Sequence, residues 1–193
     1  MDVYASASLG HAARLFELKR VGPPQIFAHN ELCIVCRSEF VVDELALPDL
    51  LASDAVRVAT STPVSDPMGD YTWQFFKNAD AEHPGFYRIM DAKALKLSGA
   101  STPLPGTRSP YVAAFADDKT DAYVMYATNA MLVKEALPHL AIMPIPKQLN
   151  VYSAYAIAAG RNSDAGQRLV SFVMDPEGRA ILEKYGFFYR QKT

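Results

Sequence analysis

The chain has 193 residues, of which 50% are hydrophobic and 21% are charged, so it is long enough for one domain or two small lobes and has the composition of a folded protein. Its formal net charge of -2 at pH 7 argues against a general attraction to nucleic acid or anionic membranes, so we predict no nucleic-acid partner. No apolar run approaches the roughly 18 residues of a membrane span, and the N-terminus does not have the pattern of a secretory signal peptide.

Strand-like and helix-like segments alternate along the chain, which is typical of an α/β protein with mixed, mostly parallel sheets. Hydrophobic periodicity and turn residues define these segments. In chain order, the predicted elements are a strand at 2–7, a helix at 10–19, strands at 25–27 and 32–36, a short helix opening at 47, a strand at 56–60, a helix starting at 67, a helix at 111–116, a strand at 122–126, a helix at 129–137, strands at 140–145 and 151–158, and helices at 163–174 and 176–185.

Two strand-loop-helix units offer backbone N–H groups at a helix start beside hydroxyl side chains. In the first, Asp66 is a good N-cap and Pro67 suits the first helical position. In the second, residues 103–110 lead into an apolar helix, with Ser109 as the candidate cap. Helix starts of this kind bind anions, although ordinary capping explains the same pattern.

The two cysteines, Cys33 and Cys36, have CxxC spacing, which also occurs in redox and zinc sites. They lie in a predicted buried strand, where positions three apart point to opposite faces. No second CxxC and no nearby histidine pair would complete a zinc site. We therefore predict buried, structural cysteines.

Catalytic and cofactor motifs are not found in the sequence. The four histidines lack metal-binding spacing, and there is no nucleophile elbow, Walker loop or dinucleotide fingerprint. Asp117 and Asp118 follow a predicted helix and are best interpreted as a solvated turn. The aromatic group from Tyr71 to Phe76 has the spacing of a helix that buries most of it. We predict that the chain is not an enzyme, binds no cofactor and has no metal-binding site.

Beyond these patterns, the chain resembles the periplasmic molybdate-binding proteins of ABC transporters, which are type 2 periplasmic solute-binding proteins. The resemblance covers essentially the whole chain and depends on the order and spacing of several segments. These are DVYASAS at residues 2–8, FAHNELC at 27–33, TSTP at 60–63 with SDPMGDY at 65–71, YVMY at 123–126 and EKYGF at 183–187.

The resemblance implies two lobes that close around a dehydrated tetrahedral oxyanion, molybdate or tungstate, held by neutral hydrogen bonds in a cleft. It places residues 1–38 and 148–193 in the first lobe and 39–147 in the second. It also implies an ABC permease as partner and a periplasmic location. The ligand donors it implies are Met68, Arg108 and Tyr126, with Ser65, Gly69, Thr107 and Ser109 as possible further contacts.

One departure from the family concerns the first lobe. Family members begin with a further β-α-β stretch of roughly 30 residues or more, which carries the first lobe's serine donors. Here Met1 stands where the family has a small residue. We therefore expect an incomplete first lobe, with weak oxyanion binding or association with another copy of the chain as a homo-oligomer.

Other functions remain open at this point. The chain could be a truncated paralogue with weakened binding, or the effector-binding domain of a regulatory system, which would need a DNA-binding segment from elsewhere. A small transferase that uses one of the anion-binding loops is a third possibility. If Arg108 faces the ligand, the site gains a formal cation and could accept a different anion.

Overall fold

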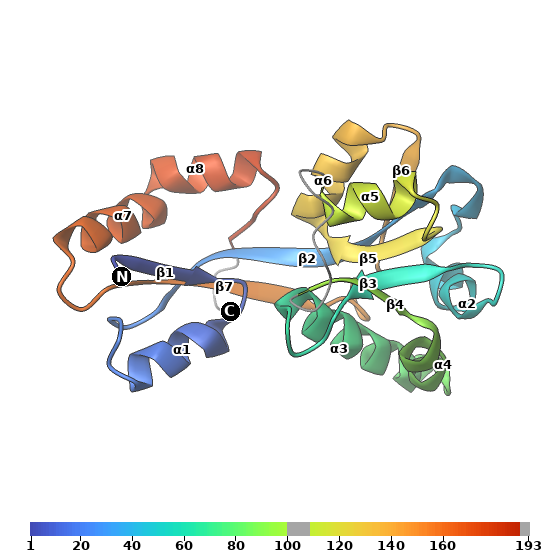
Figure 1. Cartoon of the computed structure of the whole chain (residues 1–193), viewed down its shortest axis with the longest axis horizontal. Coiled ribbons are helices and arrows are strands. Elements are labelled where there is room, and N and C mark those ends of the chain that lie inside the picture. Colours follow the sequence, from blue (N-terminus) through green and yellow to red (C-terminus); the bar gives the residue numbers. More distant parts are fainter. Residues whose placement is uncertain (100–108, 190–193) are drawn as a thin grey trace. The chain divides into compact units, whose positions relative to one another are not determined.

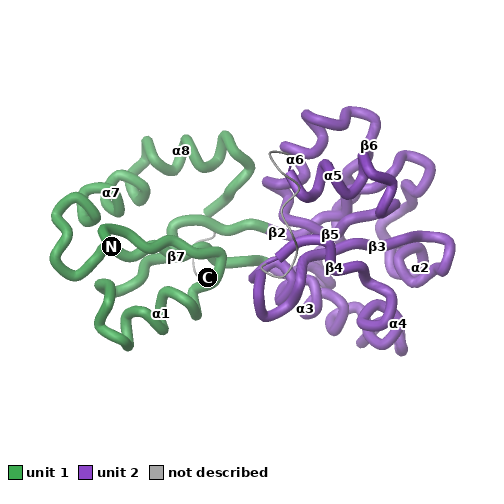
Figure 2. Tube along the Cα trace, viewed as in Figure 1, with its two compact units in different colours: residues 1–30, 152–193 green, residues 31–151 purple. Residues whose placement is uncertain are grey.

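The chain forms two compact units in the computed structural model, which describes residues 1–99 and 109–189 (Figure 1). Unit 1 contains residues 1–30 and 152–193, and unit 2 contains residues 31–151 (Figure 2). The lobe boundaries expected from the sequence, after residue 38 and before residue 148, lie within unit 2. The chain therefore leaves unit 1 once, along a single strand, and returns to it once.

Unit 1 is a small sheet with helices on both faces. Strand β1 pairs antiparallel with β7, from Val3 opposite Ala159 to Ser6 opposite Ala156, and the other neighbour of β7 is β2. Helices α1 and α7 pack on β7, on opposite sides of it in Figure 1. The elements are β1 (Val3–Ser6), α1 (Leu9–Glu17), the first part of β2 (Gln25–Arg37), β7 (Tyr152–Ala159), α7 (Asp164–Met174) and α8 (Pro176–Lys184).

The two C-terminal helices match the helices predicted at 163–174 and 176–185 to within one residue, and a side chain caps the start of each. The Ser163 hydroxyl accepts a hydrogen bond from the Gly166 N–H at 2.9 Å, and the Asp175 carboxylate accepts one from the Gly178 N–H at 2.9 Å. Gly186, with φ of 84°, follows α8 in the left-handed conformation that glycine adopts without strain. These local predictions are confirmed.

Unit 2 is an α/β layer structure with the strand order β6-β2-β5-β3-β4. Figure 1 shows α5 and α6 on one side of these strands and α3 and α4 on the other. The elements are the second part of β2, two 3-10 turns at Ser38–Phe40 and Glu44–Ala46, α2 (Leu47–Ala52), β3 (Val58–Ser61), α3 (Pro67–Glu82), α4 (Phe86–Lys93), β4 (Leu95–Ser98), α5 (Pro110–Ala116), β5 (Ala122–Tyr126), α6 (Ala127–Ala136) and β6 (Leu140–Pro144).

The strand directions are mixed, and antiparallel pairs are more frequent than we expected. Strand β3 runs parallel to β4 and β5, but β2 runs antiparallel to β5 and β6, and β1 to β7. Helical crossovers keep β3, β4 and β5 parallel. Strand β2 is antiparallel to both of its neighbours in unit 2, β5 and β6.

One expectation for β2 was wrong, and two elements of unit 2 were not predicted. The polar pair His29-Asn30 does not interrupt β2, because the His29 backbone exchanges hydrogen bonds with Phe188 and the Ser153 hydroxyl bonds the Asn30 carbonyl. Helix α4 and strand β4 were missed. Helix α4 begins after Gly85, which is left-handed with φ of 96° and has no capping side chain, so it carries no start signal.

The core of unit 2 contains the aromatic face of α3. Trp73, Phe75 and Phe76 are buried as predicted, and Phe86 of α4 lies with its ring 6.1 Å from Phe75 and 5.9 Å from Phe76. The Trp73 indole N–H donates to the Asp91 carboxylate at 2.7 Å. Because large aromatic rings dominate core energetics, this cluster fixes α3 and α4 against each other.

Both cysteines are buried in β2, as predicted. Burial raises the pKa of Cys33 to about 12 and that of Cys36 to about 11. Thiols with such a high pKa are poor nucleophiles and poor metal ligands at neutral pH. Within residues 1–99 and 109–189, no group of three or more His, Cys, Asp or Glu side chains could hold a metal ion, and no helix is long and apolar enough to cross a membrane.

Candidate ligand-binding site

The parallel strands β3, β4 and β5 end at a common edge of unit 2, and hydroxyl-bearing residues occupy these ends. We use the name carboxyl edge for Thr60, Ser61, Ser98 and Tyr126 together with the loop of residues 62–66. Strand β3 continues through this loop into α3, and β5 continues directly into α6. In open α/β sheets, ligands bind outside the carboxyl ends of the strands, so this edge is the candidate site.

The start of α3 at this edge is capped by its own chain. The Asp66 carboxylate accepts a hydrogen bond from the Met68 N–H at 2.9 Å, and the Asp66 carbonyl accepts one from the Gly69 N–H at 2.9 Å. Pro67 occupies the first turn, as predicted. The Met68 N–H, a predicted ligand donor, is therefore engaged by Asp66, and an anion would reach it only in exchange for this carboxylate.

The loop before α3 is held by short polar contacts. The Thr62 hydroxyl donates to the Ser98 carbonyl at 2.9 Å, and the Ser65 hydroxyl donates to the Thr62 carbonyl at 3.1 Å. Helix α3 packs so closely on the loop that a Cβ built on Gly69 would lie 2.6 Å from the Pro63 nitrogen. The loop and the first turn of α3 therefore form one tightly packed body.

Val64 at the tip of the loop has φ of 69°, and its side chain is 91% exposed. A β-branched residue in the left-handed region stores about 1–3 kcal/mol of strain. Glycine removes that strain at a cost of about 0.4–1 kcal/mol in unfolded-state entropy. We expect Val64→Gly to stabilise the protein by about 1 kcal/mol in urea unfolding.

Val41 provides the matched control for this substitution. It is also exposed, but its φ of -70° suits valine. Val41→Gly should therefore destabilise the protein by a few tenths of a kcal/mol up to about 1 kcal/mol. Equal effects of the two substitutions would contradict a strained loop.

Tyr126 ends β5 and occupies the N-cap position of α6, with only 6% of its surface exposed. Its ring lies 6.4 Å from the ring of Tyr71, in the second turn of α3, at an interplanar angle of 61°. Thr128 lies within the first turn of α6, which begins two residues before the helix predicted at 129–137. The predicted donors Met68 and Tyr126 are thus on the ends of adjacent strand-helix units.

Sequence reasoning missed a hydroxyl pair at the same edge. The Tyr123 hydroxyl donates to the Ser98 hydroxyl at 2.9 Å and lies 3.3 Å from the Thr60 carbonyl. Burial raises the pKa of Tyr123, so the phenol stays neutral. Thr60, the last residue of the strand predicted at 56–60, was the available signal, whereas Ser98 gave none because β4 was not predicted.

The remaining predicted site residues lie near α5 or outside the described part of the chain. Ser109 is the residue before α5, but its side chain makes no capping hydrogen bond. It lines a pocket of about 320 Å³ with Tyr111, Val112, Asn129, Leu132 and Ala136. Thr107 and Arg108 lie outside the described residues.

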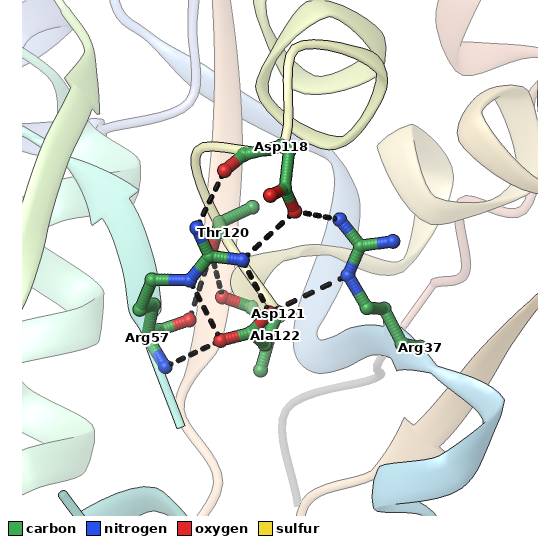
Figure 3. Close-up of polar contacts among 6 residues, drawn as sticks. All are labelled: Arg37, Arg57, Asp118, Thr120, Asp121 and Ala122. Carbon is green, nitrogen blue, oxygen red and sulfur yellow. Dashed lines mark hydrogen bonds and ion pairs between the residues drawn. The ribbon is translucent and has the colours of Figure 1, made fainter. Parts of the chain in front are cut away.

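A second polar cluster lies at the amino ends of β3 and β5, opposite the carboxyl edge (Figure 3). Arg57 donates to both oxygens of the Asp121 carboxylate, at 2.9 and 2.7 Å. Arg37 and Arg57 both donate to one oxygen of Asp118, at 2.6 and 2.9 Å. The hydrogen bonds from Arg57 lower the pKa of both carboxyl groups. The turn containing Asp118 is exposed, as expected, although two arginines bind the Asp118 carboxylate. Through these contacts the cluster joins the ends of β2, β3 and β5.

The α/β fold of the chain is that of the type 2 periplasmic binding proteins. The chain matches the bacterial extracellular solute-binding protein family over residues 1–188. It belongs to this family.

Several known proteins are similar to the chain. An uncharacterized protein, PM1146 of Pasteurella multocida, is 30% identical over 167 residues, covering 82% of this chain and 67% of that protein. The periplasmic molybdate-binding protein of Azotobacter vinelandii has a TM-score of 0.70 at 15% identity, covering 98% of this chain and 79% of that chain. The sulfate-binding protein SubI of Mycobacterium tuberculosis has a TM-score of 0.74 at 15% identity, covering 96% and 68%. PEB3 of Campylobacter jejuni with bound L-phospholactate has a TM-score of 0.70 at 16% identity, covering 98% and 80%.

Proposed function

We propose that the chain is the solute-binding component of an ABC importer and captures a tetrahedral oxyanion of the molybdate or tungstate type at the carboxyl edge of unit 2. The observation that carries this proposal is the convergence of neutral hydrogen-bonding groups where three parallel strands end. The similar proteins that bind molybdate and sulfate support an oxyanion over other solutes. A permease of the importer is the proposed partner.

The chemistry of the edge suits a small anion. A dehydrated dianion is held well by several N–H and O–H groups in a site of low dielectric constant, where each bond is stronger than in water. We assign the Met68 N–H and the Tyr126 hydroxyl as donors, with Ser65 and Gly69 beside them. The segment containing Thr107, Arg108 and Ser109 is proposed to complete the set.

Tyr126→Phe tests this assignment by removing one hydroxyl and leaving the ring. Hydrogen bonds to charged groups contribute about 1.5–3 kcal/mol, so the variant should bind molybdate roughly tenfold to a hundredfold more weakly in calorimetric titration. The matched control is Tyr87→Phe. Tyr87 lies in α4, with its ring near the Lys77 ammonium group, and this variant should keep the wild-type affinity.

The ligand panel should contain molybdate, tungstate, sulfate, phosphate and L-phospholactate. Selective binding of the first two supports the proposal. Binding of L-phospholactate alone would reassign the site to phosphorylated organic acids, and binding of none would overturn the oxyanion function. Trp73 is the single tryptophan of the chain and lies in α3, so its fluorescence provides an independent measure of binding.

A further inference from the structure

The hydroxyl groups of Thr60 and Ser61 are a feature of the carboxyl edge that the assigned donors do not explain. Both residues have 0% exposure, and within the described part of the chain neither hydroxyl oxygen has a hydrogen-bond partner. A buried polar group without a partner loses its hydrogen bonds to water and forms none in the protein, which costs free energy. Such groups are rare in folded proteins, and each one calls for a specific explanation.

The neighbouring hydroxyls show that the loop can satisfy such groups. The Thr62 and Ser65 hydroxyls donate to backbone carbonyls of Ser98 and Thr62, at 2.9 and 3.1 Å. The Thr72 hydroxyl, in the second turn of α3, donates to the Met68 carbonyl at 2.8 Å. The last two residues of β3 therefore differ from the hydroxyls around them.

The two side chains flank the end of β3 on opposite faces of the sheet. Ser61 is the register partner of Ser98, so it lies on the face where the Tyr123 hydroxyl bonds Ser98. Strand alternation places Thr60 on the other face, with Tyr126, whose ring contacts α3. One hydroxyl thus lies on each side of the strand end, directly before the loop that leads to the Met68 N–H.

We infer that Thr60 and Ser61 are two further ligand-binding residues, whose hydroxyls donate to oxygen atoms of the bound oxyanion. This inference rests on the proposed function, because it takes the carboxyl edge as the anion site. A tetrahedral oxyanion presents oxygens in several directions, and donors on both sides of β3 complement that geometry. An oxyanion with no proton is the favoured class, since it can accept from every donor at once.

Binding requires a small rearrangement of the loop of residues 62–66. Both hydroxyl oxygens are closed off from water, so an anion reaches them only when the loop shifts away from the strand end. The anion then takes the place of the Asp66 carboxylate at the Met68 N–H, which that carboxylate caps in the ligand-free protein. The oxyanion thus replaces the Asp66 carboxylate as the anionic partner of α3. Its oxygen atoms also accept hydrogen bonds from the Thr60 and Ser61 hydroxyls.

Thr60→Val and Ser61→Ala test the inference, because they remove each hydroxyl and leave the approximate shape. Removal of an unpartnered buried hydroxyl should leave the thermal midpoint of the ligand-free protein unchanged or raised. Affinity for molybdate in calorimetric titration should fall about tenfold or more in each variant, since a hydrogen bond to the anion is lost. Thr60→Ser keeps the hydroxyl and should keep the affinity.

Thr120→Val is the matched control at the opposite end of the strands. The Thr120 hydroxyl is also buried, but it lies 2.7 Å from the Ala122 carbonyl and 3.0 Å from the Arg57 carbonyl. This variant should lose thermal stability and keep its affinity for molybdate, which is the reverse of the pattern for Thr60→Val.

The possible outcomes distinguish failure of this inference from failure of the proposed function. Wild-type affinity in both Thr60→Val and Ser61→Ala, with molybdate bound by the wild-type protein, overturns the inference and leaves the proposed function in place. A lower thermal midpoint for both ligand-free variants also overturns the inference, because it assigns the hydroxyls a structural partner. If the wild-type protein binds none of the oxyanions, the proposed function fails and the inference fails with it.

Discussion

Replacing Gly69 with alanine is expected to destabilise the protein by about 3 kcal/mol, at the upper end of the usual cost of overpacking. The added Cβ would lie 2.6 Å from the Pro63 nitrogen and 2.6 Å from the Thr62 carbonyl carbon. Both are backbone atoms, so no side chain can rotate away, and α3 must move off the loop. Urea unfolding measures the loss as a lower midpoint with an unchanged slope. Affinity for molybdate should fall in parallel, because the movement displaces the Met68 N–H.

Gly10→Ala is the matched control for this substitution. Gly10 is the second residue of α1, and the nearest atom to an added Cβ is the Ser8 hydroxyl oxygen at 3.5 Å, an ordinary contact. Because alanine favours a helix over glycine by about 0.5–1 kcal/mol, this change should be neutral or stabilising. Wild-type stability in Gly69→Ala would show that the loop and α3 are not packed as described.

Asp121→Asn is expected to cost about 2–3 kcal/mol at pH 7, because the carboxylate accepts charge-assisted hydrogen bonds from Arg57 and is largely buried. Its side chain is 10% exposed, and it accepts from the Arg57 backbone N–H at 2.9 Å as well as from the guanidinium group. An amide of the same shape keeps the packing but loses the charge. The measurement is the free energy of unfolding in urea.

The pH dependence of this loss has a definite sign. The hydrogen bonds from Arg57 lower the pKa of Asp121 in the folded state below its usual value. The contribution of a group with a lowered pKa is complete above the unfolded pKa, about 3.9, and is lost as the pH falls through the folded pKa. The difference between wild type and Asp121→Asn should therefore be full at pH 7 and shrink at pH values below about 4.

Asp117→Asn serves as the control for a surface carboxylate in the same turn. Asp117 lies 3.6 Å from the Lys119 ammonium group, and the Lys119 side chain is 60% exposed. Exposed ion pairs contribute about 0–1 kcal/mol, so this change should be small at every pH. A difference for Asp121→Asn that stays constant from pH 7 to pH 2 would contradict the role assigned to its ionised carboxylate.

The local elements of both units were predictable from short-range signals. Asp66 with Pro67, and Asp175 with Pro176, mark helix starts because a cap needs only a side chain and an N–H group two or three residues later. The buried aromatic face of α3 follows in the same way from its helical spacing. Signals of this kind fail at Gly85, where a helix begins without a cap, and at His29-Asn30, where distant residues keep β2 continuous.

The candidate site was predictable in its position but not in its contacts. The strand-loop-helix pattern indicated the β3–α3 loop, and the resemblance to the molybdate-binding proteins indicated Tyr126 at the end of β5. The capping prediction for Asp66 implied that its carboxylate accepts from an N–H of the first turn. The sequence did not indicate that, among the described residues, Thr60 and Ser61 have no hydrogen-bond partner for their buried hydroxyls while Thr62 and Ser65 do. This difference depends on where β4 and α3 pack against the end of β3.

The α/β class, most helix starts, the buried cysteines and the β3–α3 loop follow from patterns in the sequence. The antiparallel course of β2, the pairing of Arg57 with Asp121, 64 residues away, and the burial of the two hydroxyls at the end of β3 follow from tertiary contacts. The two groups of features differ in the sequence distance over which the interactions that define them act. Capping and periodicity act over about four residues, whereas strand direction and buried hydrogen bonds depend on which distant segments the crossovers place side by side.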